Sequence, residues 1–312
     1  MMTRARSGAR LLKAYDLCMK TIALMLGALM LGSVTMLLGQ ESQIRVIAFG
    51  AHPDDCDIRA AGSAALWKKM GIAVKFVSIT NGDVGHQTMH GEELARRRLG
   101  EAKESARRLG IEYDVLDNHD GKLLPTLDVR EEVIREIRGW KADLVLAPRP
   151  NDYHPDHRYT GVLVQDAAYM VVVPHLIPEV PALRKNPVFM YYEDGFQRPN
   201  PFHPDIAVRI DEVIDKKIDA MDSHVSQFYE WLPWTEGQFE QVPKDPAERK
   251  KWLAVSMRGE RKLQPEWREA LEKRYGAQAA GIQHAEAFEI TEYGRQPSEE
   301  EIRKLFPFFS ER

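Results

Sequence analysis

The 312-residue sequence has only two cysteines, Cys18 and Cys56, so no disulfide framework holds the fold together. It also lacks a basic surplus, since 43 Lys and Arg stand against 47 Asp and Glu, giving a formal net charge of -4. A protein that binds the phosphates of nucleic acid normally carries excess positive charge, so we expect no nucleic-acid partner. Hydrophobic residues make up 44% of the chain, enough for an ordinary packed core, and we expect one large domain rather than two.

Long apolar runs are also scarce, with one exception near the N-terminus. Basic residues precede an uncharged apolar stretch from Thr21 to Gly39, a pattern typical of a signal peptide or a signal anchor. The stretch is just long enough to cross a bilayer, and Leu37 stands where a cleavage site after Gly39 would prefer a small residue. Cleavage and retention therefore both stay open for residues 1–42, and a buried helix of the domain is the minority alternative.

This segment determines where we expect the rest of the protein to lie. A positive flank on the cytoplasmic side sends the chain after it across the membrane. The catalytic domain is then expected to be exported, either periplasmic or extracellular, or anchored to the membrane outside the cytoplasm. Membrane contact is expected only through the uncleaved segment.

The glycine-rich G-x-G-x-x-G motif of dinucleotide-binding folds is absent, because the first expected strand runs directly into His52 and Pro53. From residue 43 onward, short β-branched runs alternate with longer amphipathic stretches, the pattern of βαβ units on a parallel sheet. We expect strands at Ile44–Phe49, Ala73–Ile79, Tyr113–Leu116, Asp143–Ala147, Val188–Tyr192 and Ile206–Ile210. We expect helices at Ile58–Met70, Glu92–Leu109, Asp128–Arg138 with Asp128 as N-cap, and Asp211–Met221, with mostly helical chain over Lys244–Arg274.

These elements predict an α/β, Rossmann-like fold with a mostly parallel sheet and helices on both faces. In such open sheets the binding crevice forms beyond the carboxyl ends of the strands, so the active site is expected there. Residues 43–312 would form a single catalytic domain, with a partly helical C-terminal extension over about 228–312.

Two polar runs follow expected strands. Ala51–Asp55 (Ala-His-Pro-Asp-Asp) follows the first, and Asn151–His157 (Asn-Asp-Tyr-His-Pro-Asp-His) follows the fourth. Imidazoles and carboxylates together form the N/O ligand set that suits zinc, and a catalytic zinc keeps three protein ligands and an open water position. Either run alone could be a surface turn, since Asp and Pro are common in turns. Their shared position favours a metal centre, and we expect the prolines to fix both runs without help from a helix.

These two runs resemble the two signatures of the LmbE/PIG-L family, which includes deacetylases of N-acetylglucosaminyl inositols, of mycothiol and bacillithiol precursors and of chitobiose. Other pieces match the family in the same order: Asn81-Gly82-Asp83, Arg98 and Glu101 before Leu109-Gly110, Asp120-Gly121, and His224-Val225-Ser226-Gln227. The resemblance covers about Ile44 to Gln227, and nothing beyond Gln227 aligns with the family.

The resemblance implies that His52, Asp55 and His157 bind the metal, which would be zinc or, alternatively, iron(II). It also implies that Asp54 is the general base that takes a proton from metal-bound water. The neighbouring Asp54 and Asp55 would therefore have different roles, although they are chemically identical.

The same resemblance implies roles around the substrate. His154 would face the substrate and either stabilise the tetrahedral oxyanion or protonate the leaving amine. Asp156 would orient and tune a nearby imidazole. Arg98 and Asp120 match positions that contact sugar hydroxyls, although the run Arg96–Arg98 could instead be a solvated helix face.

We therefore expect a metal-dependent hydrolase that removes the acetyl group from an N-acetylglucosamine-like sugar conjugate and releases acetate and a free amino sugar. Its partner would be a small molecule or a glycoconjugate. Two alternatives stay open: a metal hydrolase of another amide or ester, and a non-catalytic, membrane-tethered carbohydrate-binding protein. The presence of Asp54 argues against the second alternative, because a pure binding module has no need of a base beside the metal.

Truncation before the first strand tests the boundary at residue 43. A chain that begins at Gln40 is expected to fold and bind metal, because the apolar run belongs to the membrane or to a processing enzyme. Circular dichroism and metal content of the purified truncated protein check this. If that protein is insoluble or inactive while the full chain is active in detergent, the segment is part of the domain.

Overall fold

The computed structural model describes residues 43–260 and 263–309. The expected targeting segment, Thr21 to Gly39, lies outside these residues, and its role stays a prediction. Among the helices that the structure describes, none is long and apolar enough to cross a bilayer.

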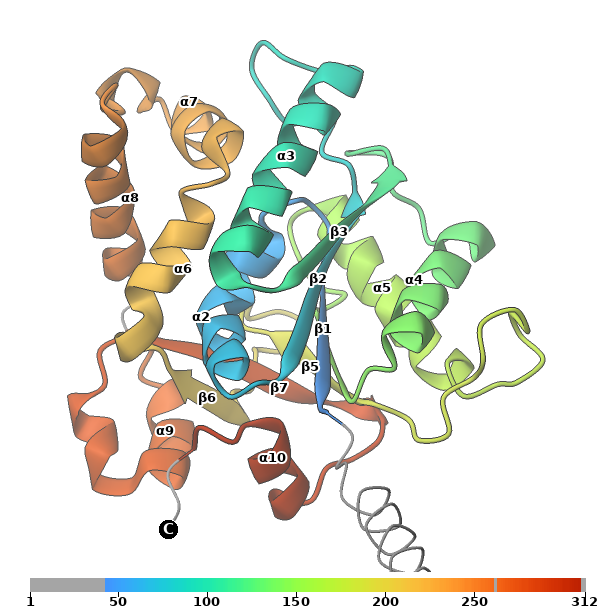
Figure 1. Ribbon diagram of the computed structural model, residues 1–312. Helices are drawn as coiled ribbons and strands as arrows, with labels where there is room; N and C mark the ends of the chain where they lie inside the picture. Colours follow the sequence, from blue (N-terminus) through green and yellow to red (C-terminus); the bar gives the residue numbers. More distant parts are fainter. Residues whose placement is uncertain (1–42, 261–262, 310–312) are drawn as a thin grey trace, which may run out of the picture. The chain divides into compact units, whose positions relative to one another are not determined.

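Within the described residues, seven strands form one sheet in the order β3-β2-β1-β4-β5-β7-β6 (Figure 1). Neighbouring strands are parallel from β3 through to β5, and β7 runs antiparallel to both β5 and β6. The mostly parallel sheet predicted from the sequence is therefore confirmed. The strands are β1 Arg45–Gly50, β2 Ala73–Thr80, β3 Glu112–Asn118, β4 Leu144–Ala147, β5 Val188–Tyr192, β6 Ile206–Arg209 and β7 Ala285–Gly294.

Helices cover both faces of this sheet. The α-helices are α2 Asp55–Lys69, α3 Gly91–Leu109, α4 Leu127–Trp140, α5 Pro155–Met170, α6 Ile214–Met221, α7 Leu232–Thr235, α8 Pro246–Glu260, α9 Trp267–Tyr275 and α10 Glu299–Leu305. A π-helical segment, η2 Ser226–Trp231, precedes α7. Short 3₁₀ segments are η1 Asp211–Val213, η3 Phe239–Gln241 and η4 Gly276–Gly281.

Successive residues of β1 point to opposite faces of the sheet, and each face has its own hydrophobic core. Val46 and Ala48 pack with α2, α3 and α6, whereas Ile47 and Phe49 pack with α4 and α5. All four side chains are fully buried, as expected for a parallel strand covered on both sides. The prediction of helices on both faces is confirmed.

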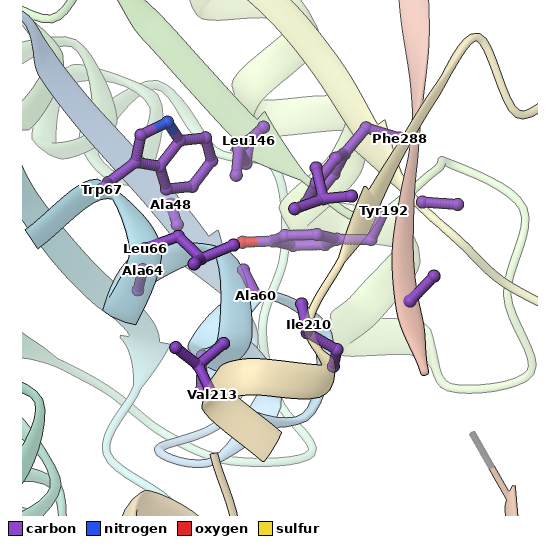
Figure 2. Close-up of a cluster of buried hydrophobic side chains, with 14 of the residues drawn as sticks. Ala48, Ala60, Ala64, Leu66, Trp67, Leu146, Tyr192, Ile210, Val213 and Phe288 are labelled. Carbon is purple, nitrogen blue, oxygen red and sulfur yellow. The ribbon is translucent and has the colours of Figure 1, made fainter. Parts of the chain in front are cut away.

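The core on the α2 face shows how closely that helix approaches the sheet. Figure 2 shows Trp67 of α2 in the same cluster as Tyr192 of β5 and Phe288 of β7, with the small side chain of Ala60 between larger ones. Trp67 also donates its indole N–H to the carbonyl of Leu305, at 2.7 Å. The C-terminal segment is therefore packed against the last turn of α2.

Both polar runs end in the first turn of a helix, which the sequence analysis did not expect. Helix α2 begins at Asp55, three residues before the expected start at Ile58. Helix α5 was not predicted; it begins at Pro155, and the side chain of His154 accepts a hydrogen bond from its first turn. The expectation that these runs are held without a helix is therefore wrong. A proline fits the first position of a helix because that residue needs no amide hydrogen.

Three further elements differ from the prediction. Asp128 was expected to cap α4, but the side chain of Thr126 accepts from the amide of Val129, and Asp128 lies inside the first turn. Strand β7 was not predicted, and neither was α10, whose start carries a capping box of Ser298 and Glu301.

A buried ion pair between α6 and β7 holds α2 in place. The ammonium group of Lys217 donates to the carboxylate of Glu286 and to the carbonyl of Ile58, at 2.7 Å from the latter. The same carboxylate accepts from the amides of Gly62 and Ser63, at 2.9 and 2.7 Å. Both charged side chains are fully buried, so each depends on the other for its charge to be tolerated.

Removing one partner of this pair should destabilise the fold strongly. Lys217→Met leaves the Glu286 carboxylate buried without its cation, and we expect the free energy of unfolding to fall by about 3–5 kcal/mol. Urea unfolding of the variant measures this. The control is Lys69→Met, which breaks the exposed pair with Glu212 and should cost less than about 1 kcal/mol. Equal stability of the two variants would contradict the prediction.

Candidate metal centre and active site

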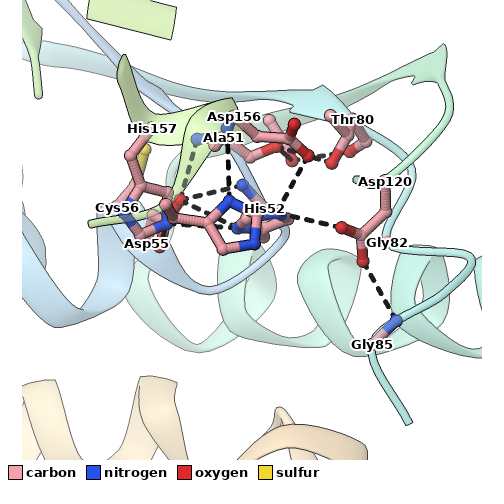
Figure 3. Close-up of polar contacts among 12 residues, drawn as sticks. Ala51, His52, Asp55, Cys56, Thr80, Gly82, Gly85, Asp120, Asp156 and His157 are labelled. Atoms are coloured by element: carbon pink, nitrogen blue, oxygen red, sulfur yellow. Dashed lines mark hydrogen bonds and ion pairs between the residues drawn. The ribbon is translucent and has the colours of Figure 1, made fainter. Parts of the chain in front are cut away.

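The two polar runs meet between β1 and β4, where the order of the strands along the sheet reverses. Strand β1 lies between β2 and β4, and the chain proceeds outward from it in both directions. The connection after β1 leads to α2 on one face, and the connection after β4 leads to α5 on the other. Connections that part in this way leave a crevice at the carboxyl ends of the strands. Figure 3 shows side chains from both runs in contact there.

Three side chains form a set of ligand atoms that face one another. The Nδ1 atom of His52 lies 3.3 Å from Nε2 of His157 and 3.6 Å from Oδ2 of Asp55. The Nε2 atom of His157 lies 3.4 Å from Oδ1 of Asp55. Three N/O ligands of one tetrahedral zinc ion are roughly 3.3–3.6 Å apart, because each lies about 2.0–2.2 Å from the metal. The spacing of the two imidazole nitrogens therefore fits a zinc ion, and Asp55 faces each of them with a different carboxylate oxygen. His52, His154 and His157 are likewise close enough together to hold a metal ion.

The other ring nitrogen of His52 faces a second pair of carboxylates. Its Nε2 atom lies 3.1 Å from Oδ1 of Asp120 and 3.4 Å from Oδ2 of Asp156. Backbone amides fix both acids: Gly85 donates to Asp120 at 3.1 Å, and Gly121 donates to Asp156 at 2.7 Å. Burial alone would lower the pKa of His52, but these carboxylates and Asp55 raise it well above its usual value. His52, Asp120 and Asp156 are also close enough to hold a cation.

Hydrogen bonds within the second run orient the imidazoles of His154 and His157. Asp152 contacts Nδ1 of His157 at 3.0 Å, so Nε2 is directed toward the ligand set. The Nδ1 atom of His154 accepts the amide hydrogen of Asp156, at 3.2 Å, so a neutral His154 carries its proton on Nε2. Burial and the neighbouring His52 lower the pKa of His154 below its usual value, which favours that neutral form.

The neighbouring carboxylates Asp54 and Asp55 have different surroundings. Oδ2 of Asp55 accepts from the amides of Ala51 and His52, both at 2.8 Å, so its orientation toward the two imidazoles is fixed. Burial would raise the pKa of Asp55, but His157 and His52 lower it well below its usual value. Burial and the charge of Asp55 raise the pKa of Asp54 to about 6. The two neighbouring carboxylates therefore differ in how readily they take up a proton.

Arg98 and Asp120, which the resemblance assigns to sugar hydroxyls, contact protein groups in the structure. Arg98 is buried and donates to the carbonyl of Gly82 at 2.9 Å and to Oε1 of Gln227 at 2.6 Å. Its Nη1 atom lies 3.6 Å from Oδ2 of Asp120, which in turn contacts His52. These contacts place the pair in the wall of the site, where they fix the loop after β2. Their contact with a sugar stays a prediction.

The His-x-Ser-Gln element, residues 224–227, lies in the C-terminal half of the chain. Its side chains contact α2 and α3 next to the site. His224 lies 3.1 Å from the carboxylate of Asp57, a buried residue two positions after Asp55. Ser226 donates its hydroxyl to Glu101 at 2.6 Å. The supporting roles of Asp57 and of Asp152 were not predicted. Both lie within or beside the motifs, but a supporting contact becomes visible only when its partner imidazole is located.

Comparisons with known proteins agree with this geometry. A family model described as GlcNAc-PI de-N-acetylase (PIG-L) matches residues 47–168, which contain both polar runs. A diacetylchitobiose deacetylase from Thermococcus kodakarensis is 34% identical over 203 residues, which cover 61% of this chain and 73% of that protein. The chain belongs to the PIG-L family. The resemblance seen in the sequence is thereby confirmed, as is the class of enzyme, because the homologues are N-deacetylases that hydrolyse amides.

Two other proteins are similar to this chain. A solved N,N'-diacetylchitobiose deacetylase from Pyrococcus horikoshii matches with a TM-score of 0.60 and 26% identity, covering 80% of this chain and 85% of that one. A mycothiol S-conjugate amidase from Streptomyces coelicolor is 28% identical over 187 residues, covering 50% of this chain and 63% of that protein. The likeness extends across most of the described sheet and helices and confirms the α/β fold.

The contact between Asp152 and His157 generates a prediction about metal affinity. The carboxylate of Asp152 orients His157 and makes its imidazole more basic. Asp152→Asn removes that carboxylate, so zinc should bind about 10–100-fold more weakly without loss of the fold. Competition with a chromophoric chelator measures the dissociation constant. Asp166→Asn, which changes an exposed carboxylate on α5, the helix that carries His157, is the matched control and should leave the affinity unchanged. A normal dissociation constant for Asp152→Asn would show that this carboxylate does not support the metal ligand.

Proposed function

We propose that this PIG-L protein is a metal-dependent deacetylase that removes the acetyl group from an N-acetylglucosamine-like sugar conjugate. The observation that carries the proposal is the difference in surroundings between Asp54 and Asp55. Asp55 is directed at two imidazoles in a spacing that suits one metal ion, while Asp54 stands beside that set with a raised pKa. A hydrolytic site needs both a metal ligand and a base, and these neighbours supply one each.

His52, Asp55 and His157 would hold the metal. Their two nitrogens and one carboxylate oxygen suit zinc first and iron(II) as the alternative. When bound, such an ion supplies Lewis-acid chemistry, which polarises a carbonyl and acidifies a water molecule.

The chain's own residues would perform the proton transfers. Asp54 takes a proton as the oxygen of water bonds to the acetyl carbon. The Nε2–H group of His154 would donate a hydrogen bond to the oxyanion, or His154 as the imidazolium would pass a proton to the amide nitrogen as the C–N bond breaks. When His154 stays neutral, the proton held by Asp54 goes to that nitrogen instead. Acetate and a free amino sugar result. Asp120 and Asp156 keep the ring of His52 in place during the reaction.

The substrate class follows from the relatives and from the N-terminal segment. The relatives named above act on diacetylchitobiose and on mycothiol conjugates, which supports an N-acylated amino sugar. An exported enzyme would not meet cytoplasmic thiol precursors, so we infer a cell-wall, glycolipid or imported oligosaccharide as the natural substrate. Purification of the mature protein from the cytoplasm would remove the basis of this inference.

Acetate release with and without a chelator tests the proposed function. Purified enzyme should release acetate from N-acetylglucosamine conjugates, lose that activity after chelation, and regain it when zinc is restored. A metal hydrolase of another amide or ester would release no acetate from these sugars but would act on other acyl compounds. A binding protein would retain the sugars without releasing acetate from any of them.

Replacement of Asp54 and replacement of Asp55 should impair the enzyme in different ways. Asp54→Asn should keep near-stoichiometric zinc and lose roughly 10²–10⁴-fold in turnover, the usual contribution of a positioned general base. Asp55→Ala should lose the metal itself, and excess zinc should restore activity only in part because one ligand is missing. The measurement is zinc content beside acetate-release rate for each variant. If Asp54→Asn purified without zinc and Asp55→Ala kept its full zinc content, Asp54 would be the metal ligand and Asp55 the base.

A further inference from the structure

The loop between β2 and α3, residues 81–90, lies directly against the wall of the proposed active site. The amide of Gly85 donates to Oδ2 of Asp120 at 3.1 Å, and Oδ1 of the same carboxylate lies 3.1 Å from Nε2 of His52 (Figure 3). A Cβ atom added to Gly85 would lie 3.3 Å from Oδ2 of Asp120 and 3.4 Å from Nη1 of Arg98. The loop backbone therefore packs closely against both side chains, and a shift of the loop would move the carboxylate that contacts His52.

His86, the residue after Gly85, ties this loop to the C-terminal half of the chain. Its Nδ1 atom accepts the amide hydrogens of Thr88 and Met89, at 3.2 and 3.1 Å, so a neutral ring carries its proton on Nε2. That Nε2 atom lies 2.8 Å from Oε2 of Glu230 in η2. Only 4% of the His86 side chain is exposed. Because both ring nitrogens are hydrogen-bonded and the ring is buried, His86 anchors the loop to Glu230.

Helix α3 in turn holds Glu230 in place. Arg97 donates to both carboxylate oxygens of Glu230, at 2.6 and 2.7 Å, which is the bidentate geometry of a strong ion pair. One turn further along α3, Glu101 accepts from the amide and the hydroxyl of Ser226, at 3.0 and 2.6 Å. Burial would raise the pKa of Glu230, but Arg97 and His86 lower it below its usual value. Glu230 is therefore a fixed anion on η2, and the loop is bound to it through one imidazole.

We propose that Glu230 is a positioning residue of the active site. Through His86 it holds the loop between β2 and α3 in place. The amide of Gly85 is then kept at Asp120, and Asp120 is kept at Nε2 of His52. A carboxylate that orients a metal-binding imidazole is effective only when its own position is fixed. The inference rests on the proposed function, because it takes His52 as a metal ligand, and it adds a residue that touches neither metal nor substrate.

Hydrogen exchange at Gly85 tests whether Glu230 holds the loop. In the zinc-loaded full-length protein, Glu230→Ala should speed exchange of the Gly85 amide about tenfold or more, because the loop loses a hydrogen bond to a charged group. Mass spectrometry of peptides that contain Gly85 measures this. Glu236→Ala removes an exposed carboxylate at the end of α7 and is the matched control, which should leave the exchange unchanged. Equal exchange rates in the two variants would overturn the proposal.

A second pair of variants separates the loop contact from the ion pair with α3. His86→Asn keeps an acceptor for the two loop amides, but its shorter side chain does not reach Glu230, and the ion pair of Glu230 with Arg97 stays intact. Exchange at Gly85 should rise as it does in Glu230→Ala. His90→Asn, the same change at an exposed position four residues further on, should have no effect. If His86→Asn left the exchange unchanged, Glu230 would hold only η2, and the proposal would be wrong.

A double-mutant cycle tests whether Glu230 acts through Asp120. Asp120→Asn should weaken zinc binding about 10–100-fold, because it removes a carboxylate that orients His52. Glu230→Ala should weaken zinc binding several-fold when Asp120 is present and should have no further effect when Asp120 has been replaced. Competition with a chromophoric chelator measures the dissociation constants. A general loosening of the fold would instead weaken zinc binding equally in both backgrounds, and that result would contradict the proposal.

Failure of this inference can be told apart from failure of the proposed function, because exchange and zinc binding require no turnover. If Asp120→Asn weakens zinc binding but Glu230→Ala does not, the metal site stands and the positioning role of Glu230 is wrong. If Asp120→Asn leaves zinc binding unchanged, the proposed orientation of His52 is wrong and the positioning role falls with it. If zinc binds as expected but no sugar releases acetate, the proposed function is wrong, and the double-mutant cycle still decides the role of Glu230.

Discussion

The rest of the site depends on the contacts of the His52 imidazole, because its two nitrogens face two different groups of atoms. Nδ1 faces Asp55 and His157, while Nε2 faces Asp120 and Asp156. When the proton of a neutral ring is on Nε2, toward the carboxylates, the lone pair of Nδ1 is free for a cation. The negative charge of Asp120 and Asp156 also makes that lone pair more basic, which would prepare Nδ1 for its proposed role as a metal ligand.

The fold brings these groups together from four loops. Strands β1 and β4 are neighbours, so their carboxyl ends supply the two runs of His and Asp residues. Asp120 follows β3 and is tied to the loop after β2 through the amide of Gly85. Both runs end at helix N-termini, where the positive end of the helix dipole stabilises the carboxylates of Asp55 and Asp156. The N-termini of α2 and α5 therefore contribute to the charge balance of the site as well as to its geometry.

Much of this arrangement could be predicted from the sequence, because it depends on patterns within short segments. Strands β1, β2, β4 and β5 are runs of buried β-branched and aromatic residues, and their ends fixed where the two motifs would meet. Strand β7 was missed because its sequence, Ala285–Gly294, mixes glutamates with apolar residues, and its pairing with β5 and β6 is a long-range contact. Helix α5 was missed because His154 and Pro155 are also typical of a turn. Which nitrogen of His52 faces which carboxylate depends on side-chain geometry that no motif encodes.

We propose that the metal lies on the Nδ1 side of His52, and locating a bound ion in a crystal would show whether it does. Anomalous diffraction at the zinc edge from crystals of the zinc-loaded protein would locate that ion. The account predicts a single strong peak within about 2.0–2.2 Å of His52 Nδ1, a carboxylate oxygen of Asp55 and His157 Nε2. A peak on the opposite side, between His52 Nε2, Asp120 and Asp156, would contradict it and would make Asp55 a supporting residue rather than a ligand.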